Sequence, residues 1–156
     1  MKAILLIDHG SRRKEANDMV YCMANLLQTL AGPGVIVRPS HMEIEEPTIA
    51  QGFVSCVEAG ATEVVAFPYM LSPGRHSIEH IPEMVAAAAA SFPAVSFHIT
   101  PAFGVHEKLA ELILSRVGVE RYAGATTDFD CCWSPDKAHV SCGDACRVRQ
   151  ALPVGA

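Results

Sequence analysis

Five side chains that can bind a metal ion or accept a proton follow the ends of three apolar segments. They are His9 after the first segment, His41 and Glu43 after the second, and His76 and His80 after the third. Imidazole and carboxylate ligands together suit borderline divalent ions such as iron, cobalt, nickel and zinc. Neutral imidazole also accepts protons. The sequence therefore predicts metal or proton chemistry, provided that the fold brings these three ends together.

The elements that must position these side chains alternate between strand and helix. Apolar runs predict strands at 3–7, 35–37 (reaching towards 40), 64–67 and 95–99. Helical spacing and end signals predict helices at 19–30, 47–59, 82–91 and 106–117. Four βα units of this kind predict an α/β fold, with a four-stranded parallel sheet flanked by helices on both faces. Ligands bind outside the carboxyl ends of such strands, so we expect the five side chains to share one edge.

Length and composition restrict the class of protein. A chain of 156 residues with a net charge of −5 can bury one core, and its charge argues against a nucleic-acid partner. We expect a chelating or catalytic domain at 1–117 and an irregular, cysteine-containing extension at 118–156. Neither a membrane span of about 18 apolar residues nor a signal peptide is evident. We therefore expect a cytoplasmic protein with reduced thiols and no membrane partner.

Several polar residues and cysteines are better explained by structure than by chemistry. Glu45 and Glu46 are typical of a solvated acidic turn, and His98 falls within a predicted strand. Cys22 and Cys56 fall within predicted helices, where cysteine acts as a small apolar packing residue. The sequence DHGSRR after the first strand is not a glycine-rich phosphate loop, so nucleotide binding is not predicted.

Four stretches of the sequence resemble the short class II chelatases, the family of sirohydrochlorin cobaltochelatase and ferrochelatase. They are LLIDHGSRRKEAN, HMEIEEPTIAQG, VVAFPYMLSPGRH and PAFGVHEKLAELI, at 5–17, 41–52, 64–76 and 101–113. The resemblance implies an enzyme that inserts cobalt or iron into sirohydrochlorin, in cobalamin or siroheme biosynthesis. The family's metal-handling and catalytic residues match His9, Glu43 and His76.

One position departs from the family pattern. The family usually places an acid before the Ile-Pro that follows its metal-binding histidine, and here that residue is His80. His80 is then either an additional ligand or a neutral replacement, and we favour the replacement. Whether His41 joins the metal site is left open.

The resemblance also bears on assembly and on the tail. Long family members contain two such halves around the macrocycle, so a single half is expected to form a homodimer. Some short members, notably the plant type, carry an iron–sulfur cluster on a cysteine-containing extension. Its possible ligands here are Cys131, Cys132, Cys142 and Cys146. A zinc site is the nearest rival, and unligated thiols are a further alternative.

Sirohydrochlorin has a flat apolar ring with acidic side chains, so its site should combine an apolar slot with cations. The candidates for the apolar slot are Tyr69, Met70, Leu71 and Phe103. The candidates for contacts with carboxylates are Arg12, Arg13 and Arg75, near the backbone amides of Gly10 and Ser11 at a helix start. Arg12 and Arg13 are equally typical of a solvated helix terminus.

Two other classes of protein remain possible on this sequence. A metal-carrying or storage protein would use the histidines without inserting the ion. An iron–sulfur electron-transfer or redox-sensing protein would use the tail cysteines. Because affinity at a generic N/O site rises from iron through cobalt to nickel, the ligand types do not identify the metal.

Overall fold

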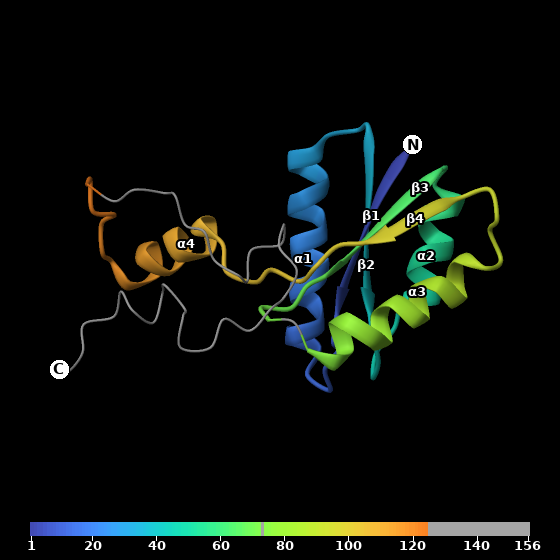
Figure 1. Cartoon of the computed structure of the whole chain (residues 1–156), viewed down its shortest axis with the longest axis horizontal. Coiled ribbons are helices and arrows are strands. Elements are labelled where there is room, and N and C mark those ends of the chain that lie inside the picture. Colours follow the sequence, from blue (N-terminus) through green and yellow to red (C-terminus); the bar gives the residue numbers. More distant parts are fainter. Residues whose placement is uncertain (73, 125–156) are drawn as a thin grey trace, which may run out of the picture. The chain divides into compact units, whose positions relative to one another are not determined.

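The structure is a computed structural model that describes residues 1–72 and 74–124. The chain divides into two compact units, Met1–Phe103 and Gly104–Ala156. The first contains, in chain order, β1 (Lys2–Asp8), α1 (Lys14–Ala31), β2 (Val35–His41), α2 (Ile49–Glu58), β3 (Glu63–Pro68), the π-helical turn η1 (His76–His80), α3 (Ile81–Ala89) and β4 (Ser96–Ile99) (Figure 1). The second contains α4 (Glu107–Val117). The four predicted βα units are confirmed.

Two expectations are not tested by this description. The domain boundary predicted after residue 117 stays a prediction. The four tail cysteines lie outside the described residues. Within residues 1–72 and 74–124, none of the helices has the length and apolar character needed to cross a membrane.

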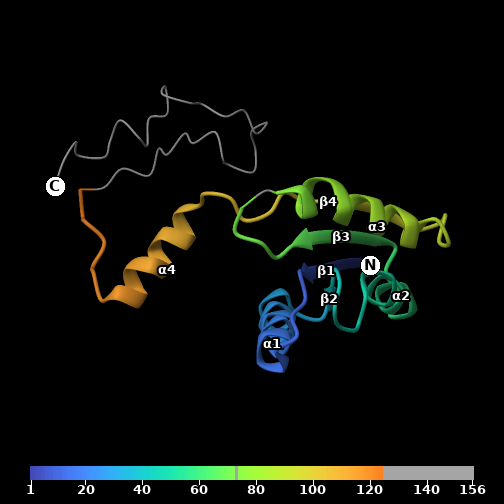
Figure 2. The same cartoon turned by 90° about the horizontal axis from the view of Figure 1, so that it is seen from below.

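All four strands are parallel and lie in the order β2-β1-β3-β4. Figure 2 shows β1 and β3 side by side and running in the same direction. From β1 the chain passes to β2 on one side, and it then crosses back to place β3 on the other side. The loops after β1 and β3 therefore open at a topological switch point, where ligands bind in open α/β sheets.

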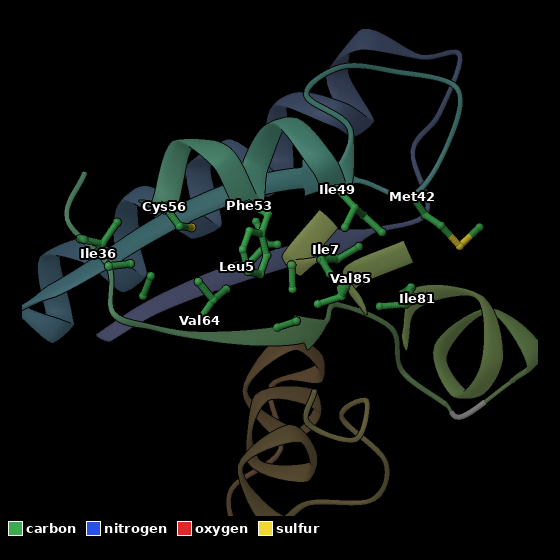
Figure 3. Packing of buried hydrophobic residues seen from close by; sticks show 14 residues of the cluster. Leu5, Ile7, Ile36, Met42, Ile49, Phe53, Cys56, Val64, Ile81 and Val85 are labelled. Atoms are coloured by element: carbon green, nitrogen blue, oxygen red, sulfur yellow. The ribbon is translucent and has the colours of Figure 1, made fainter. Parts of the chain in front are cut away.

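The core of the first unit lies on both faces of β1. Leu5 and Ile7 belong to a cluster with α2 and α3 that includes Phe53 and Ile81, and Figure 3 shows this packing. Leu6, with its side chain on the other face, packs with residues of α1. The continuous apolar run of β1 is thus explained by burial on two faces, as predicted.

The buried face of α1 differs from the most apolar stripe in its sequence. Val20 and Ala24 are buried, whereas Met19, Leu26 and Leu30 are exposed. Small side chains let the helix backbone approach the sheet closely, with Met23 and Leu27 packed beside them, whereas the other long aliphatic side chains are exposed. The helix itself was predicted correctly, but its spacing of large residues identified the packed face only in part.

Two helical cysteines and one strand histidine can now be placed. Cys56 is buried in the core, as predicted, and burial raises the pKa of its thiol to about 11. Cys22 is exposed, so its prediction as a packing residue is wrong. His98 lies in β4 as expected, but its side chain is about half exposed, and its Nδ1 lies 3.7 Å from Oε1 of Glu63.

Candidate active site

His9 and Glu43 face each other because the backbone remains paired beyond the ends of their strands. The N–H of Met42 donates to the carbonyl of Asp8 over 2.9 Å, and the N–H of Glu43 donates to the carbonyl of His9 over 3.2 Å. The side chains then meet, with Nε2 of His9 3.0 Å from Oε1 of Glu43. Both side chains are about half exposed, at 45% and 52%, so an ion or a small molecule from solvent can reach them.

Both ring nitrogens of His9 lie near oxygen acceptors. Nδ1 is 3.2 Å from the carbonyl of Gly10, and Nε2 is 3.0 Å from the carboxylate of Glu43. Metal-binding histidines commonly donate one N–H to a backbone carbonyl and use the other nitrogen as ligand. With Nδ1 donating to Gly10, the free Nε2 and the Glu43 carboxylate would converge on a cation.

His76 reaches the same edge of the sheet from the loop after β3. Its ring contacts the ring of His9 edge to face, with the centroids 5.0 Å apart and the planes at 84°. Its Nδ1 faces Nδ1 of His80 over 3.1 Å. Among the residues that the structure describes, no three His, Cys, Asp or Glu side chains are already gathered to hold one ion. The site consists of two pairs, His9 with Glu43 and His76 with His80, joined by one ring contact.

His41 supports this edge of the sheet from the protein interior. Its side chain is fully buried, and its Nδ1 donates to Oδ1 of Asp8 over 2.6 Å. The same carboxylate oxygen accepts the backbone N–H of Gly10 over 3.0 Å. Asp8 therefore ties the end of β2 to the turn that carries His9. Within residues 1–72 and 74–124, Nε2 of His41 has no hydrogen-bond partner.

Glycine is required at position 10 by both conformation and space. Its φ is +85°, a region that residues with a Cβ rarely adopt. A Cβ built there would lie 1.9 Å from the carbonyl oxygen of Glu43. The close approach of these two loops therefore depends on the missing side chain.

The amides at this turn are already used within the protein. Gly10 donates to Asp8, and the N–H of Ser11 donates to Oδ1 of Asn17 over 2.9 Å. Asn17 is buried and returns a bond from Nδ2 to the carbonyl of Ser11. Both amides therefore have acceptors within the protein, and Asn17, a polar residue of α1 that looked unremarkable in sequence, satisfies one of them. Ser11 stays a predicted substrate contact.

The predicted slot residues differ in accessibility. Tyr69 and Phe103 are partly buried with ring centroids 5.2 Å apart, and the N–H of Phe103 donates to the carbonyl of Met70. Leu71 is 73% exposed. The side chains of Arg12, Arg13 and Arg75 are exposed as well, and Ser11 is half-buried.

Sequence reasoning missed two exposed apolar residues on the same loops, Ile44 and Ile78. Ile44 adopts φ of +73°, and the N–H of Glu45 donates across it to the carbonyl of Glu43 over 2.9 Å. A three-residue turn of this kind is rare and strained, and a β-branched residue makes it more so. The strained turn directly follows Glu43 in the chain, and the residue types gave no signal for it.

Comparison with known proteins now identifies the family, since the CbiX family model matches residues 3–119. The chain belongs to the CbiX family. The resemblance seen in the sequence is thereby confirmed.

Two relatives and one solved structure illustrate the similarity of this CbiX member. The chloroplastic sirohydrochlorin ferrochelatase of Arabidopsis thaliana is 40% identical over 114 residues, which are 73% of this chain and 50% of that protein. A sirohydrochlorin cobaltochelatase of Sulfurisphaera tokodaii is 27% identical over 75% of this chain and 92% of its own length. The sirohydrochlorin chelatase SirB from Bacillus subtilis subspecies spizizenii, solved with cobalt, matches with a TM-score of 0.65 and 29% identity. The match covers 75% of this chain and half of SirB. The chain spans about half the length, or less, of three curated relatives that it matches.

We predict that Gly10→Ala separates the two loops of the site. The added methyl group meets the Glu43 carbonyl and strains φ, so the free energy of unfolding should fall by about 2 kcal/mol. Thermal unfolding followed by circular dichroism measures this loss. Gly34→Ala is the matched control, because nothing lies within 4 Å of a Cβ there and its φ is not positive. Equal melting temperatures for Gly10→Ala and the wild-type protein would contradict the role given to this contact.

Proposed function

We propose that this protein is a sirohydrochlorin chelatase that inserts Co²⁺ or Fe²⁺ into the macrocycle. The observation that carries the proposal is the convergence of His9, Glu43 and His76, from the loops after three adjacent strands, at the switch point of the sheet. The names of similar proteins support it, because the Arabidopsis relative is a ferrochelatase and the Sulfurisphaera relative a cobaltochelatase. Ni²⁺ is a further candidate, since the ligand types suit it equally.

Insertion requires a metal ligand and a base in the same place. Two pyrrole protons must leave the ring while the ion passes from protein ligands to ring nitrogens. Nε2 of His9 is placed to bind the ion or to accept a proton, and the Glu43 carboxylate beside it can do either. His76 completes the set from the opposite side of the switch point.

Binding of the macrocycle would use exposed groups around these ligands. The exposed side chain of Leu71 can lie against the flat ring, and the neighbouring Tyr69 and Phe103 rings, which contact each other, can add apolar surface. Arg12 and Arg75 are exposed and can pair with the acidic side chains of sirohydrochlorin.

We predict that His9→Ala and His76→Ala each reduce metal insertion by at least about a hundredfold, the lower end of the range for losing general acid–base catalysis. Glu43→Gln should reduce it less, because the amide oxygen remains a weak ligand. Insertion is followed by the ultraviolet-visible change of sirohydrochlorin with cobalt, iron and nickel in parallel. His98→Ala is the matched control, because this exposed histidine lies in β4 outside the four side chains of the site.

The outcomes of this assay separate the proposal from its rivals. Wild-type turnover in both histidine variants would remove these residues from the reaction. A wild-type protein that binds the ions but never changes the spectrum of sirohydrochlorin would be a metal carrier.

The proposal includes a homodimer. A flat macrocycle has two faces, and one sheet edge of this size offers one wall, so two copies related by a two-fold axis would enclose it. We predict that light scattering gives twice the monomer mass at the working concentration, and that dilution to the monomer lowers activity. A fully active monomer would disprove the dimer.

The proposal also includes an iron–sulfur cluster in the tail that insertion does not require. Four cysteines within a short stretch suit soft-metal ligation, although the adjacent pair is awkward for a closed zinc site within one chain. We predict that anaerobically purified protein is brown and contains iron and acid-labile sulfide in equal amounts. Serine substitution of all four should remove the colour and leave insertion measurable; the residues are Cys131, Cys132, Cys142 and Cys146. Colourless protein with stoichiometric zinc, or loss of insertion in the folded serine variant, would refute this part.

A further inference from the structure

The ligands at the sheet edge form two pairs, and the second pair includes His80, which lies outside the predicted set of His9, Glu43 and His76. His9 and Glu43 face each other over 3.0 Å, while His76 turns its Nδ1 towards His80. The separation of the two Nδ1 atoms is 3.1 Å, and the ring centroids are 5.1 Å apart. His80 therefore contacts the proposed metal site directly, through a nitrogen that can serve as a ligand.

We infer that His76 and His80 together form a two-nitrogen site that captures the divalent ion before it passes to His9 and Glu43. This inference rests on the proposed function for the direction of transfer, but not for the binding of the ion itself. It revises the preference for a neutral replacement at position 80.

The distance between the two nitrogens suits chelation. Imidazole nitrogens bind first-row divalent ions at about 2.0–2.1 Å, and two such bonds at roughly 100° place the nitrogens about 3.1 Å apart. At present one nitrogen donates its proton to the other, and which one donates depends on the tautomer. An ion between the rings would replace that shared proton, and the tautomers would shift so that both Nδ1 lone pairs face it.

The backbone holds the two histidines on one side of a fixed turn. They are the first and last residues of η1, where the N–H of Ile81 donates to the carbonyl of His76. Between and after them, Ser77 and Ile81 are buried, and Ser77 also bonds to Gly74 through its hydroxyl. π-Helical turns are rare in proteins overall, but they occur frequently at functional sites. The buried side of the turn thus fixes it in the protein, and the two imidazoles lie on the opposite side.

The surroundings favour the arrival of a cation. The side chain of His76 is exposed and that of His80 half-buried, so an ion can reach both without opening the structure. Glu79 and Glu83, each three residues after one of the histidines, are also exposed and add negative charge to this turn. The ring contact between His76 and His9 connects this capture pair to the other pair, His9 and Glu43.

The experiment is a Co²⁺ titration of the full chain without tetrapyrrole, by calorimetry. The four tail cysteines are changed to serine in every sample so that thiolates do not compete for the ion. His80→Gln and His76→Gln should each weaken Co²⁺ binding at least about tenfold, since even the loss of residues that only support a ligand costs 10–100-fold. The double variant should be little weaker than either single variant, because both side chains hold the same ion. His98→Gln is the control and should bind like the parent protein.

A second measurement does not depend on any substitution at the pair. In nitrogen-15 spectra of the histidine rings, Co²⁺ should broaden the signals of His76 and His80 first and leave His98 sharp. The inference fails if the parent protein does not bind Co²⁺, if His80→Gln binds it normally, or if the His80 signal stays sharp. The insertion assay is read separately. Insertion with normal Co²⁺ binding in His80→Gln overturns the capture pair alone, whereas Co²⁺ binding by the pair without insertion overturns the proposed function alone.

Discussion

The close approach of Gly10 to the carbonyl of Glu43 is the contact on which the rest of the site depends. It brings the loops after β1 and β2 within one backbone hydrogen bond of each other. Asp8 reinforces the contact, because one carboxylate oxygen accepts both the Gly10 amide and the His41 imidazole. A buried imidazole without that partner would carry the desolvation cost of an unpaired polar group, of about 1–3 kcal/mol. The exposed side chains of His9 and Glu43 are therefore positioned by hydrogen bonds of the backbone and of Asp8 beside them.

The strand order determines which loops can cooperate. With β1 between β2 and β3, the loop that carries His9 is adjacent to both of the loops that carry Glu43 and His76. The two core clusters hold the sheet from its two faces, α2 and α3 on one and α1 on the other. The carboxyl ends of the strands are left as the place where the loops leave the sheet and side chains can converge on a ligand.

Sequence patterns predicted the elements well and the contacts between them less well. Apolar runs such as that of β1 identify strands because burial on two faces leaves no room for polar residues. Small residues such as Val20 and Ala24 carry the packed face of α1, and the hydropathy pattern does not distinguish this face from the exposed stripe at Leu26 and Leu30. The predicted start of α2 was also imprecise. The helix was expected from Pro47, whereas Thr48 forms the capping box and the helix begins at Ile49.

For the candidate site, too, the residues could be predicted from the sequence but most of their contacts could not. His9, Glu43 and His76 could be chosen from their residue types and their positions after apolar runs. The bond between Ser11 and Asn17 and the positive φ of Ile44 are set by tertiary contacts. The pairing of His76 with His80 could be considered from their spacing of four, but only the turn geometry makes the two Nδ1 atoms face each other.

A site built from two incomplete pairs suits an ion that must be given up. Closed structural sites of four ligands bind zinc with apparent free energies of about 10–16 kcal/mol, and release from such a site would be slow. Two half-exposed ligands, such as His9 and Glu43, leave most coordination positions to water and therefore to incoming ring nitrogens. In the proposed insertion, each nitrogen of the macrocycle would replace a water molecule before a protein ligand leaves, so the ion would never have to be free. The ring contact between His9 and His76 keeps the two pairs close enough for the stepwise exchange that the proposed function requires.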